Sequence, residues 1–257
     1  MTVEKALHQL EELQRKIYAL QYAESAISLD AVTVAPPDTA KGRSLAQGVI
    51  SGYLYPLISG KETGDLLTYL TEHKEELTPL SARQVEELQR KYDEIHRMPE
   101  EEYTAYSMLL NDAQDVWHKA KAQDDYQAFA PYLERIIEAN RKKAAYMDES
   151  QPPYDVLLGL YEQGLTTAQL DSFFARLRET IVPLLKRIRE QGRVIDDSFL
   201  YQEYPIEKQR ELSDYLMEIL GIDRAHCTIG ETEHPFTMNF DKEDVRITTK
   251  YHKNNFT

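Results

Sequence analysis

The side chains best suited to metal or acid–base chemistry in this sequence are its seven histidines, its single cysteine and its 44 carboxylates. A zinc peptidase motif is most recognisable as two histidines four positions apart on one helix, because that spacing places both rings on one face. None of the histidines has that spacing: His8, His73, His96, His118, His226, His234 and His252. His226, Cys227 and His234 are close in sequence, but their spacing matches no metal motif and favours ordinary loop and strand residues. We therefore predict no metal site from these residues.

Nucleophilic and phosphate chemistry have no better support. The sequence contains no Gly-x-Ser-x-Gly turn, and Cys227 gains no reactive pair merely by following His226. Gly221 and Gly230 are isolated, so no glycine-rich loop is present to surround a phosphate. Among 44 carboxylates, pairs at any spacing occur by chance. Spacing alone therefore supports no catalytic residue within this chain.

A more informative region is the alternation of apolar and polar residues near the C-terminus, at 234–240 and 245–251. β-Branched and aromatic residues joined by the turn-like run 241–244 predict a β-hairpin. Pro235 donates no ladder hydrogen bond, which confines its strand to an edge or places it at a strand start. An isolated hairpin is marginally stable, so we expect this one to pack on other elements.

Three polar residues alternate in the second predicted strand: Asp244, Arg246 and Thr248. Alternate residues of a strand share a face. Beside an open edge, such a stripe can bind an extended peptide by strand addition, with Arg246 holding a carboxylate. The alternative, a solvated face of an ordinary hairpin, is favoured by spacing alone.

The remaining sequence predicts the helices that must position this hairpin. Apolar residues three and four positions apart indicate about eight helices, the clearest being 3–27, 81–98, 99–123, 126–147, 166–191 and 205–221. Ser81 and Gln84 are spaced as a capping box at the start of one helix. In the last helix we expect Leu212, Tyr215, Leu216 and Ile219 to point inward. The prediction is a mostly α multi-helix bundle, with a helical domain at 1–221 and the hairpin element at 222–257.

Composition and charge exclude several classes of protein. The chain has 257 residues, 42% of them hydrophobic, which suffices to bury a core as one large or two small domains. We expect neither a transmembrane span nor a secretory signal, because no apolar run approaches about 18 residues. One cysteine forms no internal disulfide and indicates a reducing compartment, the cytoplasm. The net charge of −14 repels phosphate and anionic lipid, so neither nucleic acid nor a membrane is expected as a partner.

The hairpin contains two short motifs, His234-Pro235-Phe236 and Asp244-x-Arg246-x-Thr248. In order and separation they resemble two signatures of the carboxypeptidase Taq family of zinc-dependent metallocarboxypeptidases. The resemblance extends over essentially the whole chain, through Asp30, Thr33, Pro36, Gly42, Arg43, Trp117, Phe129 to Pro131, Tyr154 to Leu158, Phe173, Phe174 and Pro183 to Leu185. Leu29 stands where family members usually carry tryptophan.

The resemblance implies a zincin-like, mostly helical fold with a small β element beside a deep groove. It implies hydrolysis of the C-terminal peptide bond of peptides with a free C-terminus by zinc or cobalt, usually in a homodimer. The motif residues would line and support the substrate groove: His234, Pro235, Phe236, Asp244, Arg246 and Thr248. The family's His-Glu-x-x-His helix follows this strand, so its position falls beyond Thr257.

Family chains are about twice as long, so the resemblance implies the N-terminal half of an enzyme, which ends at 254–257 without a closing helix. We expect the isolated chain to bind no metal, to be catalytically inactive and to self-associate through exposed apolar surface. Two alternatives stay open. One is a non-catalytic helical peptide-binding or interaction module, and the other is complementation by a separately encoded C-terminal half.

Overall fold

A computed structural model describes residues 1–36 and 38–253 of the protein. The described residues form nine α-helices, two short 3-10 helices and three strands, which confirms the predicted mostly helical fold with a small β element near the C-terminus. The chain divides into two compact units, Met1–Ala31 with Ala35–Thr167, and Val32–Val34 with Ala168–Thr257. The proposed division after Gly221 stays a prediction, and the end at 254–257 lies outside the described residues.

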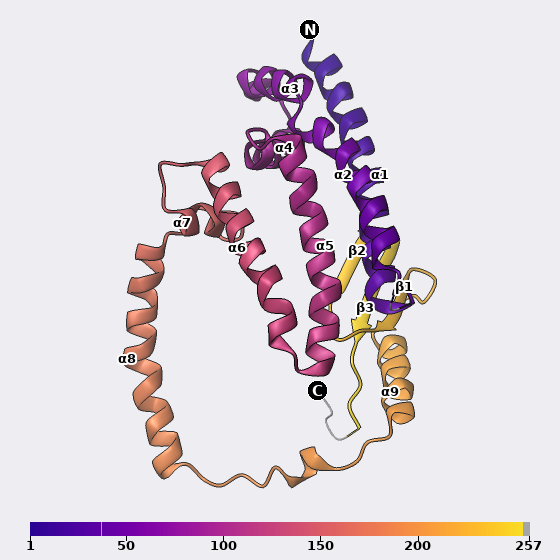
Figure 1. The fold of residues 1–257 in the computed structure, drawn as a ribbon, viewed down its shortest axis with the longest axis vertical. Helices are drawn as coiled ribbons and strands as arrows, with labels where there is room; N and C mark the ends of the chain where they lie inside the picture. The colour runs from indigo at the N-terminus through magenta and orange to yellow at the C-terminus, as the bar shows by residue number, and fades with distance from the viewer. Residues whose placement is uncertain (37, 254–257) are drawn as a thin grey trace. The chain divides into compact units, whose positions relative to one another are not determined.

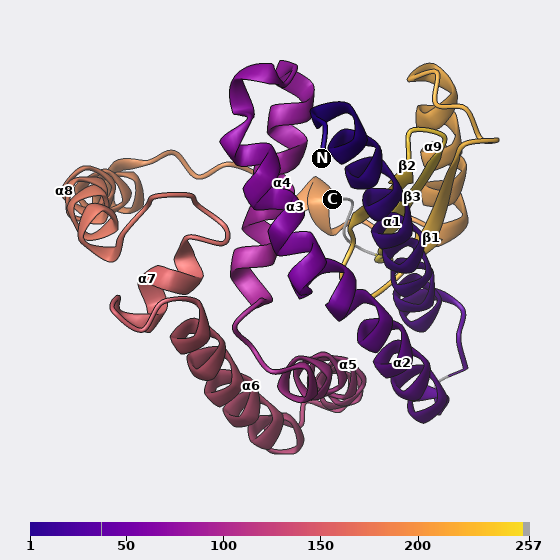
Figure 2. The ribbon, with the colours of Figure 1, turned by 90° about the horizontal axis from the view of Figure 1, so that it is seen from above.

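The first unit is helical (Figure 1). Its elements are α1 (Val3–Thr33), whose last residues pass into the second unit, α2 (Ala40–Ser59), α3 (Lys61–Glu72), η1 (Lys74–Glu76), α4 (Pro79–Ile95), α5 (Glu100–Gln123), α6 (Tyr126–Met147) and α7 (Pro153–Leu158). The core is formed by buried side chains at helical spacing on α1 to α4: Ala6, Leu10, Ile17, Leu54, Ile58, Leu66, Leu67, Leu70, Val85, Leu88 and Ile95. Helices α5 and α6 lie side by side in Figures 1 and 2.

Several helix boundaries in this unit differ from their predicted positions, among them the end of α4 at Ile95 rather than residue 98. Helix α4 begins at Pro79, before the predicted Ser81, because the Thr78 hydroxyl accepts a hydrogen bond from the Ser81 backbone nitrogen at 3.1 Å. Threonine followed by proline is the stronger start signal, since proline fits the first helical turn. Helix α1 continues beyond Ile27 to Thr33.

The second unit contains α8 (Thr167–Gln191), η2 (Ser198–Tyr201) and α9 (Ile206–Ile219), followed by strands β1 (Cys227–Glu231), β2 (Thr237–Asp241) and β3 (Asp244–Thr249). The predicted hairpin is confirmed as the antiparallel pair β2–β3. Strand β1, which the sequence analysis missed, pairs parallel with β3, and the sheet order is β1-β3-β2. The stripe of Asp244, Arg246 and Thr248 therefore lies on the central strand, and the expected open edge beside it is wrong for β3.

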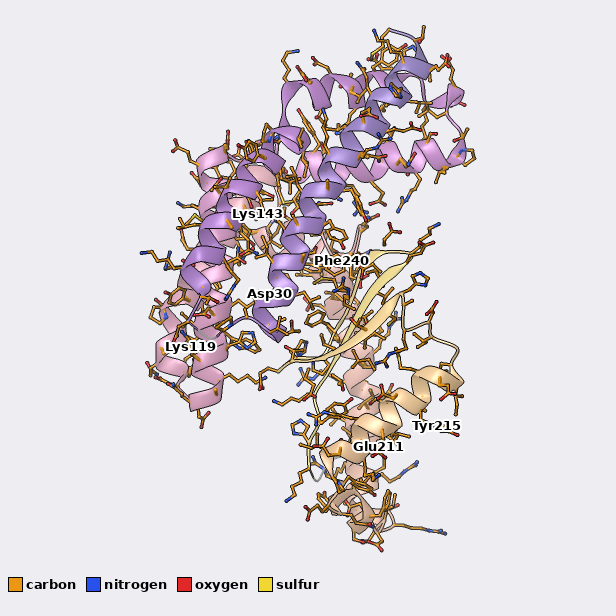
Figure 3. All side chains as sticks on the ribbon, turned by 90° about the vertical axis from the view of Figure 1, so that its right-hand side faces the viewer. Asp30, Lys119, Lys143, Glu211, Tyr215 and Phe240 are labelled. Carbon is orange, nitrogen blue, oxygen red and sulfur yellow. The ribbon has the colours of Figure 1, made fainter. Side chains whose placement is uncertain are left out.

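The inward face predicted for α9 is wrong for three of its four residues, whereas the fourth, Leu212, is partly buried. Tyr215, Leu216 and Ile219 are exposed, by 57%, 46% and 60%, and Figure 3 labels Tyr215 on this helix. Gln209 and Met217 are buried instead. The Gln209 amide donates to the backbone oxygens of Tyr204 at 2.9 Å and of His252 at 2.7 Å. These polar contacts, which apolar periodicity does not reveal, decide which face of α9 is buried. No helix of the described residues is long and apolar enough to cross a membrane.

Candidate functional site

The two motifs meet at the beginning of strand β2. Phe236 directly precedes β2, and Thr248 lies near the end of β3. The Phe236 backbone nitrogen donates to the Thr248 hydroxyl at 2.8 Å. The Thr248 backbone nitrogen and hydroxyl donate to the Phe236 carbonyl oxygen at 2.8 and 3.1 Å.

Thr248 is only 4% exposed, so this hydroxyl satisfies a donor and an acceptor in a place that water does not readily reach. A threonine supplies one proton and two lone pairs, which matches the two bonds that it makes to Phe236. The hydroxyl thereby joins the two motifs, whose closing residues are 12 positions apart in sequence.

Asp244 and Arg246 form an ion pair on the same face of β3. The Arg246 Nε donates to Asp244 Oδ1, and its Nη2 donates to Asp244 Oδ2 at 2.9 Å. Two parallel bonds fix the plane of the guanidinium group. The guanidinium carbon also lies 5.1 Å from the ring centroid of Phe240, which is buried. The register of the β2–β3 pair shifts between Asn239 and Asp241, the two residues that flank Phe240 in sequence.

Sequence spacing alone does not reveal this arrangement. Arg246 was expected to hold a carboxylate, and the carboxylate that it contacts here is that of Asp244. The two side chains are 36% and 24% exposed, so solvent screens their attraction in part. The consequence is an oriented cation, held from one side by a carboxylate and supported by an aromatic ring.

His234 and Pro235 lie in the connection between β1 and β2, and both are exposed. Their neighbour Glu233 pairs with Lys250, just after β3. This ion pair attaches the connection to the chain that leaves the central strand. The structure thus places all six motif residues on β3 or on the connection that precedes β2, and the hydrogen bonds between Phe236 and Thr248 join the two motifs.

The described residues do not fit the metal that the family resemblance implies. Among residues 1–36 and 38–253, no three histidine, cysteine, aspartate or glutamate side chains are arranged to hold a metal ion. Cys227 is buried at the start of β1 as a free thiol, and the His226 ring nitrogen Nδ1 lies 3.1 Å from the carboxylate of Asp223. A hydrolytic ion needs several such donors around one point, so we derive no step of a reaction through a metal on these residues.

A second polar cluster, missed by the sequence analysis, lies in the first unit between α1 and α2. The Ser51 hydroxyl donates to Glu24 Oε1 at 2.8 Å, and the Gln47 amide donates to the Ser28 hydroxyl at 3.1 Å. Burial raises the pKa of Glu24, and the hydrogen bond from Ser51 offsets part of this rise. Burial, with the negative charges of Glu24 and Glu94, raises the pKa of Tyr103 to about 12. Ser51 and Gln47 at helical spacing on a buried face are the signal that could have identified this cluster.

Arg43, from the N-terminal part of the resemblance, is held within the first unit. Its Nη1 donates to the Thr39 hydroxyl at 2.7 Å, and its Nη2 lies 3.9 Å from Asp115 of α5. Lys119, which Figure 3 labels on α5, pairs with Asp115 at 3.3 Å and with Asp38 at 3.1 Å. These pairs attach the loop before α2 to α5.

Comparison with known proteins supports the family resemblance. Residues 9–257 match the sequence model of the carboxypeptidase Taq (M32) metallopeptidase family. The chain is 34% identical to carboxypeptidase 1 of Bacillus subtilis over 245 residues, which cover 95% of this chain and 49% of that protein. It is 30% identical to thermostable carboxypeptidase 1 of Thermus thermophilus, covering 100% of this chain and 52% of that protein.

Solved structures show the same likeness. The crystal structure of BsuCP is 33% identical, with a TM-score of 0.92, and the alignment covers 98% of this chain and 50% of that one. Trypanosoma cruzi metallocarboxypeptidase 1 is 25% identical, with a TM-score of 0.81, covering 98% of this chain and 51% of that one. The chain spans about half the length of the curated relatives that it matches.

Proposed function

The chain belongs to the carboxypeptidase Taq (M32) metallopeptidase family, and on this premise we propose that it forms the substrate-groove half of a metal-dependent carboxypeptidase. The whole enzyme would release C-terminal amino acids from peptides that have a free C-terminus. The observation on which this proposal rests is that the Thr248 hydroxyl joins the two family motifs into one element.

The chemistry of the motif residues supports a positioning role. A peptide end carries a carboxylate, and a rigid guanidinium group is well suited to orient such a group or the strand that receives it. Asp244 and the Phe240 ring hold Arg246 in one orientation. We propose that Arg246 shapes the groove. We also propose that the bonds between Thr248 and Phe236 fix the position of β3 relative to the start of β2, with His234, Pro235 and Asp244 as further supporting residues.

We further propose that the isolated chain is inactive. The described residues offer no set of metal ligands. The matched region is only about half of the Bacillus subtilis relative, so the other half of that protein has no counterpart in this chain. In the complete enzyme, zinc or cobalt would be bound by that other part. We assign no step of the hydrolysis to this chain alone.

The expected setting of the enzyme is also a proposal. We propose that the complete enzyme is a cytoplasmic homodimer, with peptides as its partners and neither nucleic acid nor a membrane. The free, buried thiol of Cys227 and the net charge of −14 support this setting.

The test compares two proteins. One is this chain alone, and the other is this chain joined through a flexible linker to the part of the Bacillus subtilis relative that lies outside the match. Metal content is measured by elemental analysis, and amino-acid release by mass spectrometry on a peptide with a free C-terminus. We expect neither metal nor release for the chain alone, and both for the joined protein. Release by the chain alone, with one metal ion per molecule, would contradict the proposal of inactivity.

A second candidate function is a helical interaction module that has no catalytic role. It is favoured by the exposed apolar residues of α8, such as Phe173 and Ile188. The joined protein distinguishes the two candidates, because a pure interaction module would stay inactive even when one metal ion is bound per molecule.

A further inference from the structure

Helix α8 has an apolar face whose side chains are largely exposed. The face consists of residues three and four positions apart, Leu170, Phe173, Phe174, Leu177, Ile181, Leu184, Leu185 and Ile188. All of them except Leu170 are exposed, from 38% at Leu177 to 56% at Phe173. In Figure 1 the helix continues into a connection without regular structure.

Arginines border this apolar face on both sides. At about 100° per residue, Arg178 and Arg189 follow one edge, together with Asp171 in the first turn, and Arg176 and Arg187 follow the other. These four guanidinium groups make no ion pair within the part of the chain that the structure describes. The pair of Lys186 and Glu190, 3.9 Å apart, lies on the opposite side of the helix. The face is thus an apolar stripe with a basic border, on a chain whose net charge is −14.

The second unit has little core of its own to stabilise this surface. Its described apolar residues that are buried are Met217, Cys227 and Phe240. Apolar side chains are also exposed after α8, including Val194 at 99% and Ile195 at 80%. The second unit buries few apolar side chains for its length and therefore needs an apolar partner. Contiguous exposed apolar surface of this kind marks an interface.

We infer that the apolar face of α8 is the docking surface for the other half of the enzyme. The segment that it receives would be an amphipathic helix with Asp and Glu along the edges of its apolar stripe. This inference rests on the proposed function, since the relatives are about twice as long as the part matched here. The acidic edges of the incoming helix would pair with Arg176, Arg178, Arg187 and Arg189.

A second copy of this chain fits the face less well. If α8 packed against α8 of another copy, four arginines from each copy would meet along the borders of the interface, against one acidic side chain from each, Asp171. Like charges at an interface are destabilising, so such a pairing would lose the electrostatic gain that acidic edges supply.

The experiment mixes the full 257-residue chain with the separately purified remaining half of Bacillus subtilis carboxypeptidase 1. Hydrogen exchange of peptides from α8 is followed by mass spectrometry. We expect exchange in α8 to slow by at least about tenfold on mixing, because docking removes its amides from local opening. The double variant Leu177→Asp with Ile181→Asp should abolish this protection.

Matched control variants show whether an effect comes from the apolar face or from any charge introduced into α8. Val182→Asp introduces the same kind of charge at an exposed apolar position outside the stripe and should leave the protection unchanged. Arg178→Glu with Arg189→Glu should weaken binding, whereas Lys186→Glu on the opposite side should not. Circular dichroism of each variant checks that α8 remains helical.

The separately purified half of the relative could fail to fold, so the same exchange measurement is also made on the joined protein defined above. One bound metal ion per molecule shows that the second half is folded. If α8 then exchanges as fast as in the chain alone, the inference is wrong. It is also wrong if α8 is protected by self-association that the added half does not displace. Protection of α8 in a metal-loaded joined protein that releases no amino acid would uphold the docking surface and contradict the proposed function.

Discussion

The hydroxyl of Thr248 lies 2.8 Å from the backbone nitrogen of Phe236 and 3.1 Å from its carbonyl oxygen. One buried side chain thus serves as acceptor and donor for the same residue of the neighbouring segment. This relationship explains why a threonine, rather than an apolar β-branched residue, occupies the position in β3. It also adds two side-chain bonds to the backbone bond between Thr248 and Phe236 that holds the motifs together.

Replacing Thr248 by valine should weaken the hairpin. Valine keeps the shape but leaves the Phe236 N–H without its acceptor, which costs about 1–3 kcal/mol for a buried group. We expect amides of β2 and β3 to exchange at least about fivefold faster in Thr248→Val, since that is the factor for about 1 kcal/mol. Thr248→Ser keeps the hydroxyl and should exchange much more slowly than the valine variant. Equal exchange in the two variants would contradict this role of the oxygen.

Arg246→Ala, made in the joined protein, should lower amino-acid release strongly and leave the helical content unchanged. The reason is that alanine removes the oriented cation while α-helices elsewhere lose no contact. Arg210→Ala is a matched control, because Arg210 also pairs with carboxylates, Glu207 and Glu231, and lies 5.7 Å from an aromatic ring, that of Tyr251. Steady-state kinetics and circular dichroism are the measurements. Activity of Arg246→Ala within about twofold of the unmodified protein would favour a merely solvated face.

Glu24 should make the first unit less stable as pH rises. Burial raises the pKa of Glu24 in the folded state, so the folded state binds a proton more tightly than the unfolded state. The associated stability is present below the unfolded-state pKa, which is about 4.5 for a model glutamate, and is lost as pH rises through the folded-state pKa. Glu24→Gln should remove this dependence, because a glutamine side chain does not titrate.

Urea unfolding at a series of pH values measures the effect. Glu62→Gln, at an exposed position of α3, serves as the control and should leave the pH dependence unchanged. A Glu24→Gln variant that unfolds with the same pH profile as the unmodified chain would show that burial does not govern this carboxyl.

Leu70→Ala should destabilise the first unit severely. The Leu70 side chain is fully buried in the cluster formed by α1 to α4, so truncation loses transfer free energy and leaves a cavity. Leucine-to-alanine changes in such sites cost about 2–5 kcal/mol. Leu80→Ala, at a position that is 71% exposed, should cost less than about 0.5 kcal/mol. Thermal unfolding of both variants gives the comparison, and similar melting temperatures would be the contrary result.

The amino-acid sequence by itself determined most of the local structure and the family. Apolar spacing and proline placed α5, α6 and α8 within a residue or two, because these signals act between neighbours in sequence. Alternation identified the β2–β3 hairpin for the same reason. The motifs from His234 and from Asp244 identified the family, since residue types at fixed spacing are preserved in the sequence itself.

Only the tertiary structure decided how these elements use their faces. Strand β1 pairs parallel with β3, a partnership between distant segments that no local pattern encodes, and this pairing makes β3 the central strand. The buried face of α9 depends on bonds from Gln209 to Tyr204 and His252. The Phe240 ring of β2 lies 5.1 Å from the guanidinium carbon of Arg246 on β3, a contact between two strands that spacing within one strand does not reveal. Helix and hairpin formation is governed by short-range propensity, whereas pairing, register and burial are set by contacts between residues far apart in the chain.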